Sequence, residues 1–96
     1  MKINFNKDNN NLNVALEGRL DTNTAPEFEA FLGENYTGTG ALIINCENLS
    51  YISSAGLRVL LAAQKKTKGS MKLTNVCELI REVFEMTGFS DILVIE

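Results

Sequence analysis

The sequence contains no histidine. Ser-His-Asp triads, Cys-His pairs and zinc sites with histidine ligands are therefore excluded, and with them most hydrolase templates. Glycine-rich nucleotide loops are missing as well, because neither a G-x-G-x-x-G pattern nor the Gly-Lys-Ser/Thr of a P-loop occurs. We therefore expect a protein that is not an enzyme, with no catalytic residues, no bound metal and no cofactor.

Long apolar runs and an excess of basic residues are also missing. Apolar runs such as residues 41–44 and 92–95 are far shorter than the roughly 20 residues of a membrane helix. Nine Lys and Arg against twelve Asp and Glu give a net charge of −3, which disfavours binding to phosphate backbones and anionic lipids. Residues 1–5 lack the apolar stretch of a secretory signal. We expect a cytoplasmic protein that binds no nucleic acid and inserts no segment into a membrane.

Cysteine is scarce, with two residues and no C-x-x-C pair. Cys46 and Cys77 lie far apart in the sequence, and a cytoplasmic chain of this type keeps its thiols reduced. We therefore expect two buried, reduced cysteines that behave as small apolar residues of the core.

The length and composition are those of one globular domain spanning residues 1–96. The chain has 96 residues, of which 45% are hydrophobic and 22% charged. Apolar and polar residues alternate near residues 3–5 and 12–17, which predicts two strands. Asp8 and the three asparagines that follow it favour a turn that joins these strands as an antiparallel pair.

Two segments carry apolar residues at helical spacing in the first two thirds of the chain. The first helix follows Thr24, which forms a capping-box pattern with Glu27, and Pro26 is tolerated in its first turn. Gly33 is expected to begin the end of this helix. The second helix ends with three lysines before Gly69, and these cations suit the negative end of the helix.

A third helical segment has the clearest amphipathic pattern. Asn75 and Glu78, three residues apart, predict its N-terminal cap, and Gly88 predicts its end. The apolar stripe consists of Val76, Leu79, Ile80, Val83 and Phe84. We expect this stripe to face the core.

The remaining strands complete the predicted fold. Residues 41–44 form a continuous apolar run, which is typical of a central strand covered on both faces, and residues 71–74 and 92–95 predict two more strands. The element order is therefore ββαβαβαβ. Strands separated by helices imply parallel, right-handed crossovers. The predicted fold is a single α/β domain, a mixed sheet of about five strands with helices packed on it.

Two loops at the carboxyl ends of strands are candidate sites, because helix N-termini there offer free amides and a partial positive charge. The first loop contains Asp21, Thr22, Asn23 and Thr24. The second, expected over residues 50–56, leads into the second helix with Ser53, Ser54, Ala55, Gly56, Leu57 and Arg58. This helix has Arg58 and no acidic residue in its first turn, so a phosphoryl group on a serine or a partner's carboxylate suits the loop. The alternative is that the serines are plain helix N-caps.

With these residues, the chain resembles the STAS family of anti-sigma factor antagonists over almost its whole length. Residues 51–61, YISSAGLRVLL, are the most specific part of the resemblance, and residues 17–21, EGRLD, and 87–89, TGF, support the fold. The resemblance implies a non-catalytic switch whose unphosphorylated form binds an anti-sigma factor, a serine kinase of the histidine-kinase-like ATPase type. Phosphorylation of the loop serine ends that binding, and a phosphatase resets the switch.

The loop departs from the family pattern at the acceptor residue. The family commonly has Asp-Ser-Ser/Thr-Gly, with the acceptor directly before the glycine, whereas here Ala55 holds that position and Ser53 replaces the Asp. We take Ser54 as the first candidate for phosphorylation, Ser53 as the second, and both loops as the partner-binding surface.

Three other functions stay open for this chain. The first is a binding module that is never phosphorylated, and the second is a STAS accessory subunit of a lipid-transport ATPase complex. The third is a sensor or enzyme that binds a small ligand at the serine loop. The oligomeric state is also open, with a weak homodimer among the expected partners.

Overall fold

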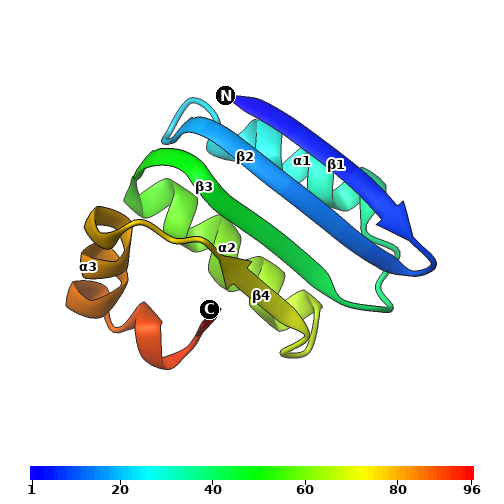
Figure 1. Cartoon of the computed structure of the whole chain (residues 1–96). Helices are drawn as coiled ribbons and strands as arrows, with labels where there is room; N and C mark the ends of the chain where they lie inside the picture. Colours follow the sequence, from blue (N-terminus) through cyan, green and yellow to red (C-terminus); the bar gives the residue numbers. More distant parts are fainter.

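The computed structural model describes residues 1–96 and has the predicted order of strands and helices (Figure 1). The strands are β1 (Lys2–Asp8), β2 (Asn11–Leu20), β3 (Leu42–Ile52), β4 (Met71–Thr74) and β5 (Val94–Ile95). The helices are α1 (Ala25–Asn35), α2 (Ser54–Lys66) and α3 (Glu78–Thr87), and a short 3-10 helix, η1 (Phe89–Asp91), follows α3. None of the helices is both long and apolar enough to cross a membrane.

The strands form one mixed sheet whose spatial order, β1-β2-β3-β4-β5, is the order along the chain. β1 and β2 are antiparallel, as predicted, and Asn9 in their turn has a left-handed φ of 58°. β2, β3, β4 and β5 pair in parallel, because each connection between them passes through a helix. β3 therefore lies at the centre of the sheet, as its apolar run predicted.

Helices cover one face of the sheet, and the opposite face is open. Figure 1 shows α1 and α2 together behind the sheet. Along β3 the side chains of Leu42 and Ile44 are buried, whereas those of Ile43 and Asn45 are half-exposed. The prediction that this strand is covered on both faces is therefore wrong. Because the parallel strands follow one another in one direction across the sheet, right-handed crossovers place their helices on the same face.

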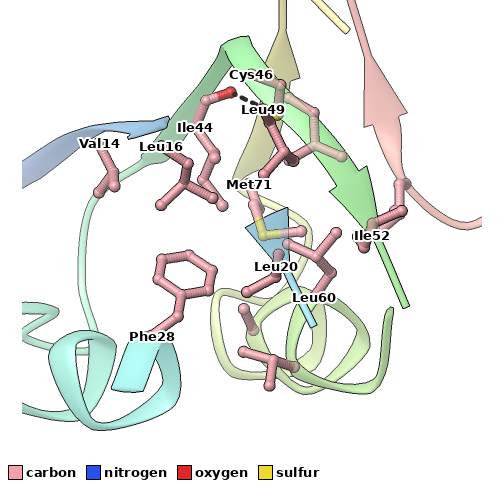
Figure 2. Close-up of a cluster of buried hydrophobic side chains, with 14 of the residues drawn as sticks. Val14, Leu16, Leu20, Phe28, Ile44, Cys46, Leu49, Ile52, Leu60 and Met71 are labelled. Carbon is pink, nitrogen blue, oxygen red and sulfur yellow. Dashed lines mark hydrogen bonds between the residues drawn. The ribbon is translucent and has the colours of Figure 1, made fainter. Parts of the chain in front are cut away.

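The core lies between the covered face and the helices (Figure 2). β2 contributes Val14, Leu16 and Leu20, and Phe28 of α1 and Leu60 of α2 lie across from them. Phe28 has no exposed surface. Burial of these apolar side chains, at about 25 cal/mol per Å², is the main stabilising contribution to the domain.

α1 continues past the residue that was expected to end it. Gly33 lies inside the helix and does not have the left-handed φ with which a glycine ends a helix. The helix ends at Asn35, because Tyr36 adopts an extended conformation and buries its ring. The Tyr36 hydroxyl donates to the Gly40 carbonyl at 2.9 Å.

α3 begins later than the capping pattern predicted. Asn75 has a left-handed φ of 55°, and its side-chain amide donates to Asn45 Oδ1 at 3.1 Å, so it bridges β3 and β4 instead of capping the helix. Cys77 occupies the N-cap position without a side-chain hydrogen bond. Gly88, with a φ of 81°, ends the helix as predicted.

The two cysteines are both free, but only one is buried. Burial, and to a lesser extent the nearby Cys77, raises the pKa of Cys46 to about 12, so this thiol stays protonated and unreactive at neutral pH. Cys77 is exposed, and the prediction that both thiols are buried is wrong for this residue. Cys77 is the N-cap residue of α3 and does not belong to the apolar stripe of that helix.

Candidate functional site

The two predicted loops lie side by side at one end of the sheet, because β2 and β3 are adjacent parallel strands. In their register Arg19 pairs with Tyr51, and Leu20 pairs with Ile52. The Ser53 N–H donates to the Leu20 carbonyl at 2.9 Å, which links the end of β2 to the start of the second loop. The structure therefore brings the two predicted segments together.

Asp21 organises the first loop through its carboxylate. Asp21 Oδ1 accepts the Asn23 N–H at 3.0 Å and the Thr24 N–H at 3.1 Å, and Arg19 Nε lies 3.6 Å from Asp21 Oδ2. These contacts, with the Thr24 N–H foremost, hold the pKa of Asp21 below its ordinary value of 3.8, although partial desolvation acts in the opposite direction. The loop is thus an Asx turn held by an ionised side chain.

Thr24 precedes α1 but does not cap it with its side chain. Thr24 Oγ1 accepts the Asp21 N–H at 2.8 Å and donates to the Arg19 carbonyl at 2.7 Å. The predicted capping box of Thr24 and Glu27 is therefore wrong. Because the Thr24 backbone is already helical, its hydroxyl points back toward the end of β2.

The second loop is shorter than predicted. β3 continues through Ile52, so Ser53 alone separates the strand from α2. Ser53 Oγ accepts the Gly56 N–H at 3.4 Å and caps the helix, which confirms the capping alternative for this serine. Ser54 is the first residue of α2 and is exposed.

Gly56 lies where α2 packs closely against the ends of β2 and β3. A Cβ on Gly56 would stand 2.8 Å from the Leu20 carbonyl oxygen and 2.9 Å from Ile52 Cγ1. Gly56 and Leu57 are buried, and Ala55 packs partly against the core. These three residues therefore position the loop, and they offer little surface to a partner.

Arg19 and Tyr51 extend the surface of the site, although Arg19 lay outside both predicted loops and Tyr51, within the second, was not among the predicted partner-binding residues. The Arg19 guanidinium carbon lies 4.0 Å from the centroid of the Tyr51 ring, a favourable cation–π pairing. Tyr51 is 39% exposed, and Arg58 is exposed nearby along the chain. No alternating pattern marks Tyr51, because two exposed residues separate each buried one between Cys46 and Ile52, and its place beside Arg19 follows only from the register of β2 and β3.

The Asp21 carboxylate is expected to stabilise the folded loop in a pH-dependent way. Because folding lowers the pKa of Asp21, this stabilisation is present above pH 3.8 and is lost as pH falls through the folded-state pKa. Asp21→Asn keeps an acceptor for the two N–H groups, and Asp21→Ala removes it. The free energy of unfolding in urea at neutral pH should be highest for the wild type, lower for Asp21→Asn and lowest for Asp21→Ala. The difference between the wild type and Asp21→Asn should vanish in acid, where Asp21 is protonated. An alanine variant as stable as the wild type would contradict this role.

Comparison with known sequences identifies relatives along nearly the whole chain. A family model described as STAS domain matches residues 2–96. A candidate anti-sigma factor antagonist of Bordetella bronchiseptica, BtrV, is 35% identical over 96 residues, covering 96% of this chain and 83% of that protein. The anti-sigma-B factor antagonist of Staphylococcus aureus is 33% identical over 84 residues, covering 83% of this chain and 78% of that protein.

Solved structures share the fold. A candidate anti-sigma factor antagonist of Thermotoga maritima aligns with a TM-score of 0.86 at 15% identity, covering 97% of this chain and 84% of that one. The unphosphorylated anti-sigma factor antagonist SpoIIAA aligns with a TM-score of 0.70 at 20% identity, covering 99% of this chain and 87% of that one. The phosphorylated form of SpoIIAA from Bacillus aligns with a TM-score of 0.72 at 21% identity, with coverages of 99% and 91%. These likenesses confirm the predicted fold class.

Proposed function

Because the chain belongs to the STAS domain family, and the relatives named above are anti-sigma factor antagonists, we propose that it binds and antagonises an anti-sigma factor. The observation that carries the proposal is the junction of the two loops, where the Ser53 N–H bonds to the Leu20 carbonyl. The binding surface then comprises the exposed and half-exposed residues Arg19, Asp21, Thr22, Asn23, Tyr51, Ser54 and Arg58. Such a role requires no catalysis and places the protein in the cytoplasm with its partner.

The anti-sigma factor in this proposal is a serine kinase of the histidine-kinase-like ATPase type, and a phosphatase reverses its action. Support comes from SpoIIAA, which has been solved in unphosphorylated and phosphorylated forms. A phosphoryl group adds about −1.5 to −2 charges at neutral pH, enough to repel an acidic or apolar partner without refolding the domain.

Ser54 is the better candidate acceptor, because its side chain is exposed at the first position of α2. Modification of Ser53 would disrupt the bond from the Gly56 N–H to its hydroxyl, and Ala55 has no hydroxyl. Arg58 lies four residues after Ser54, a spacing that places both on one face of the helix. The positive end of the helix and the Arg58 guanidinium would stabilise the phosphoryl group.

Ser54→Asp is expected to weaken binding of the anti-sigma factor at least about tenfold, because it adds charge to the centre of the surface. Its free energy of unfolding should stay within about 1 kcal/mol of the wild type. Affinity capture from the native lysate, followed by mass spectrometry and calorimetry with the captured partner, measures both effects. Ser54→Ala should bind as the wild type does.

Ala30→Asp, which adds the same charge on the exposed side of α1, is the matched control and should also bind normally. Phosphoserine analysis of the wild type tests Ser54 directly. Equal binding by the wild type and Ser54→Asp would reject regulation at this residue.

Ala55 favours a second candidate function, since it removes the usual acceptor hydroxyl. An accessory subunit of a lipid-transport ATPase complex, or another module that is never phosphorylated, needs the fold and the surface but no acceptor. Capture of a transport ATPase by both the wild type and Ser54→Asp would support this candidate and leave both serines as structural residues.

A further inference from the structure

β1 forms one end of the sheet, and its outer edge has no strand beside it (Figure 1). β2 is its only partner, so alternate residues of β1 direct their N–H and C=O groups away from the molecule. β1 is seven residues long and exposed except at Ile3, whereas β5, at the opposite edge, has two residues. β1 is therefore the edge long enough to accept another strand.

The charges at the two ends of β1 are self-complementary when two copies run antiparallel. The register that uses the whole strand places Lys2 of each copy opposite Asp8 of the other, Asn4 opposite Asn6, and Lys7, the remaining charge, opposite Ile3. Because the two copies are related by a two-fold axis, each pair of different residues occurs twice in the interface. Charged residues on an edge strand normally prevent pairing with other strands, and a shifted or parallel register would leave these charges unpaired or opposite like charges. The charge pattern thus selects a second copy of the same strand.

An aromatic side chain lies at the centre of this register. Phe5 is 51% exposed and would lie opposite Phe5 of the second copy. Its ring packs edge-to-face against Phe31 of α1, with centroids 4.9 Å apart, and Phe31 stacks on the buried Phe28 at 6.4 Å. A row of rings therefore runs from the core to the edge, and pairing would bury the exposed end of this row in both copies.

We propose that two copies of this chain form an antiparallel homodimer through β1. The two sheets then become one continuous sheet, with the helices of both copies on the same face. No residue of the two candidate loops belongs to β1, so the dimer presents both partner-binding surfaces. This interface is independent of the proposed function, and its test needs no anti-sigma factor.

The test is sedimentation equilibrium at low salt over a wide range of protein concentration. The wild type should move from the monomer mass of 10.6 kDa to twice that mass as its concentration rises. Asp8→Lys should raise the dissociation constant of the dimer by roughly tenfold or more, because two attractive pairs become repulsive. Lys2→Glu combined with Asp8→Lys should restore dimerisation, since the exchanged charges pair again.

Two controls separate the interface from general effects of charge and folding. Glu85→Lys, which makes the same change in net charge on the exposed surface of α3, should dimerise as the wild type does. Phe5→Thr keeps a strand-forming residue and should weaken the dimer, while circular dichroism confirms its fold. A wild type that stays monomeric at every concentration overturns the proposal, and so does a dimer that Asp8→Lys leaves unchanged.

Discussion

Gly56→Ala is expected to lower the free energy of unfolding by between about 1 and 3 kcal/mol, the usual effect of overpacking a buried site. The added methyl group would stand 2.8 Å from the Leu20 carbonyl oxygen, which is held in place by its bond from the Ser53 N–H. Alanine gains up to about 1 kcal/mol over glycine in helix propensity. The steric conflict exceeds this gain because one of the two nearest atoms, the Leu20 carbonyl oxygen, belongs to the backbone and cannot rotate away, and the other, Leu20 Cγ, belongs to a fully buried side chain.

Gly33→Ala is the matched control for this prediction. Gly33 also lies within a helix, but outside the backbone of that helix no atom would come within 4 Å of its added Cβ. The same substitution should therefore stabilise the protein by up to about 1 kcal/mol. Urea unfolding of both variants measures the change in the free energy of unfolding, which should be a loss for Gly56→Ala and a gain for Gly33→Ala. Equal changes would show that Gly56 is not required by the close packing of α2 against β2. Gly56→Ala should also weaken partner binding, since a shift of α2 moves Ser54.

Phe84→Ala is expected to have the largest effect on stability, a loss of about 3–5 kcal/mol. Phe84 is fully buried on the inner side of α3, and its removal would leave a cavity that the surrounding sheet cannot fill. Natural domains have about 5–15 kcal/mol of net stability, so the variant should be close to unfolding at room temperature. Thermal and urea unfolding followed by circular dichroism measure the loss.

Leu79→Ala in the same helix provides the comparison. Leu79 is 62% exposed, and its truncation should change the free energy of unfolding by no more than about 0.5 kcal/mol. Both residues belong to the apolar stripe predicted from the sequence, but the structure places them on different sides. A Leu79→Ala variant as destabilised as Phe84→Ala would contradict this orientation of α3.

The capping patterns show where local inference from the sequence stopped. Thr24 with Glu27 and Asn75 with Glu78 correctly indicated that helices begin nearby. Neither pattern identified the hydrogen bonds, because other donors and acceptors competed for the same side chains. Thr24 Oγ1 accepts the Asp21 N–H and donates to the Arg19 carbonyl, and the Asn75 amide donates to Asn45 across the sheet. A pattern of four residues contains no information about a partner thirty residues away.

The candidate site also has features that the sequence predicts and features that depend on the tertiary structure. Its two loops were predictable, because parallel strands place their carboxyl ends at one edge of a sheet. The stacking of Arg19 on Tyr51 depends on the register between β2 and β3. The need for glycine at position 56 depends on the distance between α2 and Leu20.

The sequence by itself determined the single α/β domain, the order of its elements, most of the core and the two loops that form the candidate site. Periodicity and chain order carry that information, since an amphipathic segment must bury its apolar side wherever it packs. Only the tertiary structure decided that the helices share one face of the sheet, that Ser53 caps α2 while Ser54 is exposed, and that β1 has a free edge. These features depend on strand register and on distances between segments far apart in the chain, which follow from packing of the whole domain.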